Sequence, residues 1–445
     1  MSEGRPDTEV LVAVVADGRV LVVGDPGGLQ LPRVTGADGM PSTAEVLAVA
    51  GAADAVLAAP GRLVGGRSRL VLQLVSRSAP DPDRRWLGMD ELDALDEPDG
   101  VRDTVARGVA EWGDPSVRPA GRPTWFTPGW SRAADAWIDE ELGRLGRHRA
   151  GRSEPVKVWS LSAVLRVPTV GPADVGDAAV YFKATCDWFR SEPAFTEAIA
   201  ARAPDHVPHV LALDHDRAWM LMDPIAGAGT ETPAEQAVPA AIVLAGLQSA
   251  CVHDLPRLRT AGLPDRTLEP TVRGIGAVVA DSVELDLLSA QERSDVSAMS
   301  PWLVEVLHEF GSIGLPYSVG HGDLHVGNLA VDGDDLVIYD WTDAAITFPF
   351  LDAVHLAGST GDHLRDRVLD AYARVWSAGY LRADVDRALT RAAVVNRIYQ
   401  AISYEAIYRA QEADSRWEMR GAVAGSLRSL IESWRSSSAS NRSPR

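Results

Sequence analysis

Oxygen-donor side chains are concentrated in two short stretches with a few apolar residues between them. The first is His321-Gly322-Asp323-Leu324-His325-Val326-Gly327-Asn328, and the second is Asp340-Trp341-Thr342-Asp343. Segments 329–331 and 336–339 flank an Asp-Gly pair, a pattern typical of a β-hairpin. Because an antiparallel hairpin returns to the end where it began, we expect Asn328 and Asp340 to lie side by side, with Asp323 on the loop leading in. Two carboxylates and an amide oxygen would then converge.

This set of donors suits metal-assisted phosphoryl transfer. Mg²⁺ is usually held by one or two carboxylates together with substrate phosphates, while another carboxylate orients the attacking hydroxyl. The order Asp323, Asn328, Asp340 is also that of the catalytic loop and metal site in kinases. The alternative is a polar loop whose acids only cap turns, as Asp and Asn often do. A zinc site at His321 and His325 is disfavoured, because the neighbouring donors are hard oxygens and neither cysteine is near.

The motif His-Gly-Asp-Leu-His-Val-Gly-Asn followed by Tyr-Asp-Trp resembles the Brenner-type motif of the aminoglycoside phosphotransferase and choline kinase family, which shares the protein-kinase fold. The resemblance covers about residues 155–435 and is strongest over 321–343. It implies that Asp323 is the catalytic base, that Asn328 and Asp340 bind Mg²⁺, and that ATP is the phosphoryl donor.

Three further side chains near the motif are expected to hold the catalytic loop. His321 and His325 would do so by hydrogen bonds rather than by touching the substrate. Asp352, in Phe348-Pro349-Phe350-Leu351-Asp352, matches the "P-F-x-D" segment of the resembled family and would anchor the same loop.

A lysine on a predicted strand is the candidate phosphate ligand. Strands are expected at 156–159, 163–167 and 179–183, and Lys183 ends the third. In kinases such a lysine binds the ATP phosphates and pairs with a glutamate on the next helix, here Glu192 with Glu197 as the alternative. A surface ion pair is the plainer interpretation. However, only Lys157 and Lys183 of the 43 basic residues are lysines, which hints at a task that arginine cannot fill.

Two other segments are expected to contact the nucleotide. Ser160 and Ser162 occupy the loop that is rich in glycine in protein kinases, and their small side chains could cover phosphates, which favours a small-molecule enzyme. After the apolar strand at 219–222, Asp223 and Ile225 would bind adenine through the backbone. A plain buried strand would have the same sequence.

The acceptor would lie between the catalytic loop and the last helices, by the same resemblance. Tyr404, Glu405, Tyr408 and Glu412 are spaced i, i+1, i+4 and i+8, which places them on one helical flank. Together with Asp343 they are the predicted acceptor-binding residues. A purely structural role is the alternative for each.

Composition narrows the classes of partner. The net charge of −19 argues against nucleic acid and would favour an acceptor that carries amino groups, although a solvated acidic surface is the plainer reading. No apolar run is long enough for a membrane span, the first residues do not resemble a signal peptide, and two cysteines cannot build a disulfide framework. We therefore expect a cytoplasmic protein with no membrane or nucleic-acid partner.

Residues 1–113 resemble a Nudix domain in the order of their predicted strands and helices. Gly39 and Glu45 keep the spacing of the Nudix box, and Ser42 with Glu45 predicts the cap of a helix that reaches about Ala55. However, Ala53-Asp54-Ala55-Val56-Leu57-Ala58 stands where that family has its metal-binding glutamates. Without them nothing gathers Mg²⁺ on a diphosphate, so we expect a scaffolding or ligand-sensing domain, with an unrelated small α/β domain as the alternative.

The sequence thus predicts an α+β chain. A bilobal protein-kinase-like fold, with lobes at 155–226 and 227–435, follows the Nudix-like domain and a linker with a docking helix at 114–154, and a disordered tail at 436–445 ends the chain. The predicted function is a small-molecule kinase that phosphorylates a hydroxyl of an aminoglycoside-like or other amino-bearing acceptor. A sugar or amino-sugar kinase and a non-catalytic nucleotide sensor are the alternatives, and the complete catalytic set argues against the sensor.

Overall fold

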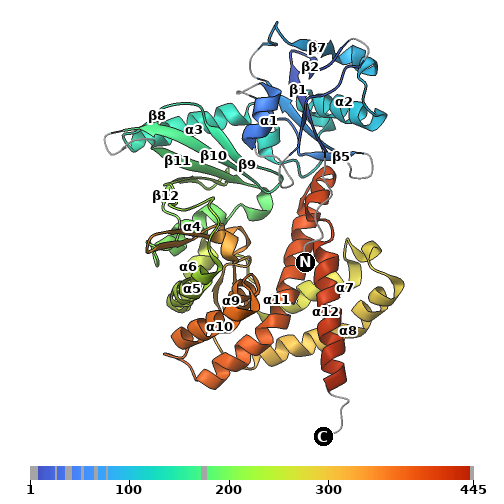
Figure 1. Cartoon of the computed structure of the whole chain (residues 1–445). Coiled ribbons are helices and arrows are strands. Elements are labelled where there is room, and N and C mark those ends of the chain that lie inside the picture. The colour runs from blue at the N-terminus through green and yellow to red at the C-terminus, as the bar shows by residue number, and fades with distance from the viewer. Residues whose placement is uncertain are drawn as a thin grey trace. The chain divides into compact units, whose positions relative to one another are not determined.

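The computed structural model describes residues 9–25, 28–35, 43–51, 55–64, 69–76, 79–171 and 178–440. The chain divides into two compact units, one comprising Met1–Asp187 with Ala410–Glu418 and the other Trp188–Arg409 with Met419–Arg445. Strands and helices occur in both (Figure 1), which confirms the predicted α+β class. Within the described ranges, no helix has the length and apolar character needed to cross a membrane.

A mixed sheet forms the amino-terminal part of the first unit. Its main strand order is β4-β6-β1-β2-β7, with β3 and β5 pairing at its sides, and β1 runs parallel to β6 while the other pairs are antiparallel. The strands are β1 (Glu9–Ala16), β2 (Arg19–Val22), β3 (Arg33–Val34), β4 (Val56–Leu57), β5 (Arg62–Val64), β6 (Arg69–Val75) and β7 (Arg85–Gly88).

Two helices, α1 (Thr43–Ala50) and α2 (Asp99–Gly113), pack on this sheet. Alternate residues of a strand face opposite sides, and β1 is buried on both. Val12 belongs to the apolar cluster that contains Val46 of α1, whereas Leu11 belongs to the cluster with Val105 of α2. The helices therefore cover opposite faces.

The first helix is shorter than the sequence predicted. It was expected to reach about Ala55, but α1 ends at Ala50 and Gly51 follows with φ +57°. A left-handed glycine of this kind commonly terminates a helix. The predicted cap residue Ser42, and Gly39, Ala53 and Asp54 of the Nudix-box comparison, lie outside the described residues.

A second group of strands in this unit carries the predicted phosphate lysine. It consists of β8 (His148–Arg149), β9 (Glu154–Val158), β10 (Ser162–Val170) and β11 (Ala179–Thr185). Helix α3 (Trp130–Arg144) covers these strands in Figure 1. Trp130 and Trp137 of α3 meet Phe182 of β11 edge to face, with ring centroids 6.0 and 5.8 Å apart. Such pairs add specific geometry to the apolar packing.

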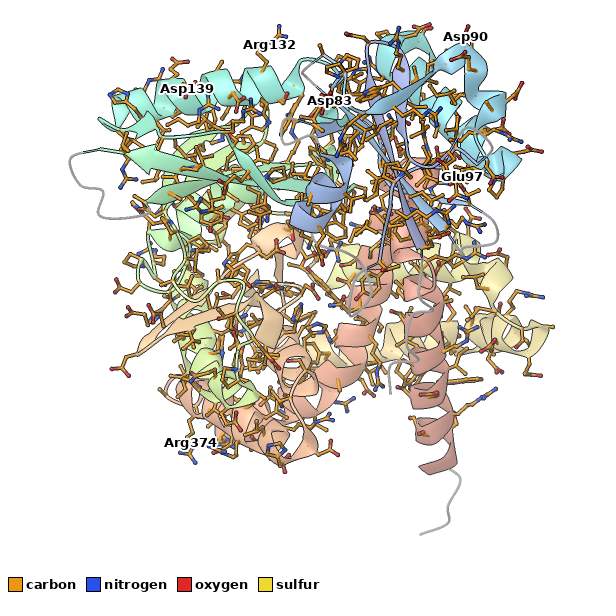
Figure 2. The ribbon with its side chains drawn as sticks, turned by 45° about the horizontal axis from the view of Figure 1, so that its top comes forward. Asp83, Asp90, Glu97, Arg132, Asp139 and Arg374 are labelled. Carbon is orange, nitrogen blue, oxygen red and sulfur yellow. The ribbon has the colours of Figure 1, made fainter. Side chains whose placement is uncertain are left out.

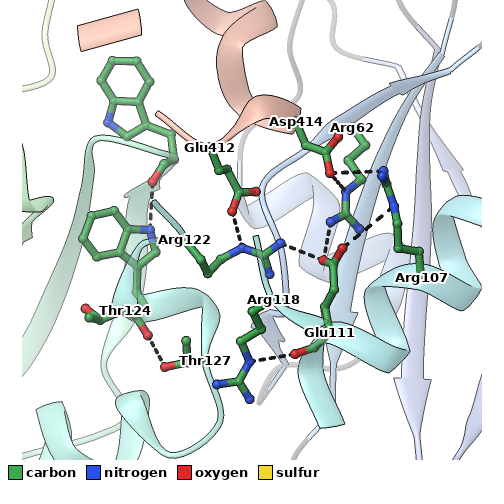
Figure 3. Close-up of polar contacts among 11 residues, drawn as sticks. Arg62, Arg107, Glu111, Arg118, Arg122, Thr124, Thr127, Glu412 and Asp414 are labelled. Atoms are coloured by element: carbon green, nitrogen blue, oxygen red, sulfur yellow. Dashed lines mark hydrogen bonds and ion pairs between the residues drawn. The ribbon is translucent and has the colours of Figure 1, made fainter. Parts of the chain in front are cut away.

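The segment Ala410–Glu418 joins the first unit through buried charges (Figure 3). Arg122 donates to Glu412 and, at 2.7 Å, to Glu111. Arg62 also pairs with Glu111 and, at 2.9 Å, with Asp414. The carboxylates of Glu111 and Glu412 are almost fully buried, so each needs its arginine to offset the cost of desolvation. This network ties a late segment of the chain to the amino-terminal sheet.

The second unit is mainly helical around one apolar core. Its helices are α4 (Glu192–Ala200), α5 (Ala237–Cys251), α6 (Leu255–Thr260), α7 (Leu268–Asp281), α8 (Ala290–Gly311), α9 (Phe350–Gly358), α10 (Asp362–Trp376), α11 (Arg382–Ala410) and α12 (Ala422–Ser440). Its strands form the antiparallel pairs β12 (Val210–Asp214) with β13 (Trp219–Met222), β14 (Ser318–Gly320) with β17 (Ala345–Thr347), and β15 (Leu329–Asp332) with β16 (Asp335–Ile338).

Charged side chains lie on the outer surfaces of both units. Figure 2 shows Arg132 and Asp139 of α3, and Arg374 of α10, pointing away from the ribbon. At the carboxyl end, α12 continues to Ser440, where the sequence predicted a disordered tail from Ser436. The rest of that predicted tail, 441–445, lies outside the described residues.

Candidate active site

The predicted hairpin positions two oxygen donors side by side. Strands β15 and β16 pair in register, with Leu329 opposite Ile338, and the turn contains Gly333 at φ +60°. Just beyond the last pair, the Tyr339 N–H donates to the Asn328 carbonyl oxygen at 3.1 Å. Asn328 therefore precedes one strand and Asp340 follows the other at the same end, which confirms the expected geometry.

The side chains of these two residues are held by neighbouring groups. The Asn328 amide nitrogen donates to the Asp323 carbonyl oxygen at 2.9 Å, which fixes the amide plane and directs its oxygen away from that bond. Asp340 has a left-handed backbone, φ 63° and ψ 60°, that is uncommon for a residue with a side chain. Its Oδ1 accepts from Thr342 Oγ1 at 3.3 Å. Strain of this kind is often found at functional sites.

The Asp323 carboxylate contacts a histidine that the sequence did not single out. His355 Nε2 of α9 lies 3.2 Å from Asp323 Oδ1, whereas His325 Nε2 is 3.9 Å from Oδ2. On the other side of the ring, His355 Nδ1 lies 3.1 Å from the amide nitrogen of Asn396 in α11. An amide nitrogen can only donate, so Nδ1 accepts and the proton of neutral His355 is on Nε2, facing the carboxylate.

Hydrogen bonds of His321 and His325 hold the loop around Asp323, as predicted. The Asp323 N–H donates to His321 Nδ1, so the proton on His321 Nε2 faces the Tyr339 carbonyl oxygen at 3.0 Å. Burial lowers the pKa of His321, which keeps the ring neutral. His325 Nδ1 accepts from Gly327 N at 3.0 Å.

Asp352 anchors the start of the same loop. Its two carboxylate oxygens accept from the backbone N–H groups of His321 and Gly322, at 2.7 and 2.9 Å. Burial raises the pKa of Asp352, while these two bonds act in the opposite direction. Gly322 has φ +86°, and a Cβ there would lie 2.3 Å from the Asp343 carbonyl oxygen. Only glycine fits this position, because Asp343 packs directly against the loop.

Two of the predicted acceptor residues lie near the Asp323 carboxylate. Burial, together with the negative charge of Asp323, raises the pKa of Asp343 to about 7, and Arg266 opposes this shift. Burial, together with the negative charges of Asp323 and Asp343, raises the pKa of Tyr404 to about 12. Asp343 also lines a cavity of 390 Å³ with Arg266 and Trp188. Tyr408 follows Tyr404 by one turn of α11 and is likewise half-buried.

The other two predicted acceptor residues have contacts elsewhere. The expectation that Glu412 shares the flank of Tyr404 is wrong, because α11 ends at Ala410 and Glu412 binds Arg122 within the first unit. Glu405 is buried and accepts from Ser282 Oγ at 2.7 Å, at the end of α7. These contacts argue against an acceptor role for either.

The residues predicted to hold the phosphates are distributed over both units. Lys183 lies on β11 opposite Val164, is 6% exposed and belongs to the first unit. Glu192 opens α4 in the second unit. Their pairing stays a prediction. Ser160 Oγ donates to Glu418, and Ser162 Oγ accepts from the Trp159 indole at 2.9 Å, so both hydroxyls have protein partners.

The predicted adenine segment follows β13. The Asp223 N–H donates to the His209 carbonyl oxygen at 3.1 Å, and the Asp223 carboxylate contacts His209 Nδ1 at 2.7 Å. The Ile225 carbonyl oxygen accepts from Ala228 N. Any adenine contact from Asp223 would therefore use its carbonyl oxygen rather than its N–H.

The donor set fits Mg²⁺ bound together with phosphates. Asp340 and Asn328 supply hard oxygens, and within the described part of the chain no three His, Cys, Asp or Glu side chains form a self-sufficient metal site. A pair of protein oxygens completed by phosphate oxygens and water is the usual Mg²⁺ arrangement in phosphoryl transfer.

Comparison with known protein families identifies one that this chain matches. The family model described as the phosphotransferase enzyme family matches residues 162–385. No curated protein matches the sequence.

Solved structures that are similar to this chain include three proteins of named organisms. Macrolide 2'-phosphotransferase MphH of Brachybacterium faecium is 16% identical, with 64% of this chain and 97% of that chain covered at a TM-score of 0.46. A choline/ethanolamine kinase family protein of Mesorhizobium loti is 18% identical, with 68% and 93% covered at 0.45. Choline kinase LicA of Streptococcus pneumoniae is 10% identical, with 67% and 99% covered at 0.43.

Proposed function

Because this chain belongs to the phosphotransferase enzyme family, and is therefore an enzyme that transfers a phosphoryl group to a hydroxyl, we propose that it is an ATP- and Mg²⁺-dependent small-molecule kinase. The sequence motif indicated this family, and membership in it agrees with the predicted protein-kinase-like fold class. The observation that carries the proposal is the convergence of Asp323, Asn328 and Asp340 at one end of the β15–β16 hairpin.

In the proposed reaction the acceptor hydroxyl gives its proton to Asp323. The hydroxyl oxygen forms a bond to the γ-phosphorus of ATP, and the bond from that phosphorus to the bridging oxygen breaks, so ADP leaves. Asn328 and Asp340 would hold Mg²⁺, which when bound neutralises charge on the phosphates. His355 donates to Asp323 Oδ1, which leaves Oδ2 for the hydroxyl proton.

We assign the nucleotide to Lys183, Glu192, the loop of Ser160 and Ser162, and the backbone after β13. The support for Lys183 is its burial on β11 in a chain with almost no other lysine. A charged amine is buried only where it has partners of opposite charge. Phosphates and a glutamate would supply that charge.

For the first 113 residues we propose a Nudix-like domain that does not hydrolyse nucleotides. The three-layer arrangement of α1, the mixed sheet and α2 supports an α/β domain. The absence of acidic side chains from 53–58, except Asp54, supports a non-hydrolytic role.

Two classes of acceptor agree with these observations. An amino-bearing molecule agrees with the net charge of −19, and a sugar or amino sugar agrees equally with the catalytic set. Net charge describes the whole surface, whereas an acceptor is selected by the side chains beside Asp323.

A coupled assay of ADP release tests the function directly. Kanamycin, glucosamine, choline, glucose and gluconate are offered with ATP and Mg²⁺, and we expect Mg²⁺-dependent ADP release with at least one hydroxylated class. Calorimetric binding of ATP, with no release for any acceptor tried, would instead favour a nucleotide sensor.

A further inference from the structure

A cavity of 370 Å³ lies between α9, α10 and α11 in the second unit. The side chains that matter for its chemistry are His355, Ser359, Arg365, Asn396 and Arg397. None of them was a predicted site residue. This volume suits a small molecule of about the size of a hexose or its phosphate.

The wall of this cavity is shared with the catalytic loop. His355 lines it and also contacts Asp323 Oδ1 at 3.2 Å. Ser359 lines it and accepts from the Val326 N–H at 3.3 Å. A molecule seated in the cavity is therefore separated from the Asp323 carboxylate by one side chain, that of His355.

The charged side chains of the cavity are both arginines, and no aspartate or glutamate lines it. This is unusual for a chain with 62 acidic and 43 basic residues. Within the described ranges, Arg365 makes no hydrogen bond or ion pair, and the one partner of Arg397 is the neutral hydroxyl of Ser433. By contrast, Arg374, on the same helix as Arg365, pairs with Asp370 at 2.6 Å.

We propose that this cavity binds the acceptor and that Arg365 and Arg397 hold an anionic group on it, a carboxylate or a phosphate. The inference rests on the kinase function proposed above and names its substrate class. Guanidinium groups bind these oxyanions through paired N–H donors, and charge-assisted bonds of this kind are the stronger ones. His355, which contacts both Asp323 and Asn396, is the side chain through which the cavity adjoins the catalytic loop.

The proposal revises the acceptor expected from net charge alone. An amino group on the acceptor is still compatible, because Asp343 and Tyr404 lie near Asp323 as well. What the two arginines require is at least one negative group.

The test compares probes that share one carbon skeleton. Gluconate and glucose 6-phosphate carry an anion, glucose is neutral, and glucosamine is cationic at neutral pH. Steady-state ADP release is measured for each with the full chain and with Arg365→Gln and Arg397→Gln. Arg367→Gln is the matched control, because Arg367 is an exposed arginine on α10 that lines a different groove.

We expect an anionic probe to give the highest kcat/KM. Arg365→Gln and Arg397→Gln should each raise the KM for that anionic probe by about ten- to a hundredfold, the usual loss for one charge-assisted contact. The kcat, the ATP dissociation constant and the melting temperature should change little, and Arg367→Gln should match the wild type.

Two results would overturn the proposal. One is turnover of glucosamine with a KM that neither Arg365→Gln nor Arg397→Gln changes, an outcome that leaves the kinase function intact. The other is that gluconate and glucose 6-phosphate are neither phosphorylated nor bound in calorimetry, while a neutral or cationic probe reacts. Failure of the kinase function looks different, because then ATP binds and no probe of any class releases ADP.

Discussion

The two carboxylates at the end of the hairpin have different expected tasks, and single substitutions separate them. Asp323→Ala removes the proposed base, so turnover should fall by about two to four orders of magnitude while nucleotide affinity stays near the wild-type value. Asp340→Ala removes a proposed Mg²⁺ ligand, so it should weaken binding of the Mg²⁺-nucleotide itself. Calorimetry on both variants is the measurement, and equal loss of nucleotide binding in the two would contradict the assignment.

His355 is a positioning residue in this scheme, because it acts through Asp323. Removing its N–H with His355→Ala should lower kcat by about ten- to a hundredfold, the effect of losing one hydrogen bond to a charged group. KM for ATP should change little. His355→Gln keeps a side-chain N–H donor, so it should recover part of kcat. A purely structural role would show as a lower melting temperature with no recovery by glutamine.

The scarcity of lysine gives a third test at this scale. If Lys183 binds phosphates and Glu192 as proposed, a planar guanidinium could not replace its compact ammonium without shifting a partner, so Lys183→Arg should reduce activity severely. Lys157 is exposed, with its Nζ 4.2 Å from the centre of the Trp159 ring, a contact that arginine also makes. Lys157→Arg should therefore be tolerated. Near-wild-type kinetics for Lys183→Arg would show that another residue binds the phosphates.

The convergence of the proposed catalytic residues was predictable because two of them flank one hairpin, where local geometry decides which residues meet. Asn328 and Asp340 needed only the register of β15 and β16, and Asp323 lies on the loop leading in. His355 and Asn396 are 41 residues apart and meet only because α9 packs beside α11. No spacing rule within a single element could find such a pair.

Element boundaries explain most of the remaining differences. The sequence indicated an acceptor flank that continued along α11 to Glu412, but the helix ends at Ala410 and the chain joins the first unit through buried ion pairs. Arg62, Arg122 and Glu111 come from three separate segments, and their charges look like ordinary surface charges in the sequence. Tertiary packing alone decides that they are buried.

The 410–418 segment should make stability depend on pH. Burial raises the pKa of Glu418 from 4.5 to about 7, while its bond with Ser160 acts in the opposite direction. Between these two values the folded state binds a proton that the unfolded state has lost, so the free energy of unfolding falls as pH rises from about 4.5 to about 7.

Glutamine does not titrate, so the difference in the free energy of unfolding between the wild type and Glu418→Gln isolates the contribution of Glu418. From about pH 4.5 to about pH 7, the free energy of unfolding of the wild type should fall by roughly 1 to 3 kcal/mol relative to that of the variant. Urea unfolding at several pH values measures it. A difference that does not depend on pH would mean that Glu418 is ionised in the folded protein throughout.

For the whole molecule, we propose that the chain combines a phosphotransferase with a Nudix-like domain that lacks the metal-binding glutamates of the Nudix box. If segment 53–58 cannot gather Mg²⁺, the full chain should have no hydrolase activity on nucleoside diphosphate derivatives. Asp323→Ala is the right background for this test, because it silences the transfer site and leaves the amino-terminal domain unchanged. Release of nucleoside monophosphate from ADP-ribose and from a nucleoside diphosphate sugar is measured with and without Mg²⁺. We expect neither substrate to be cleaved, and Mg²⁺-dependent cleavage that persists in this variant would assign the domain a catalytic role of its own.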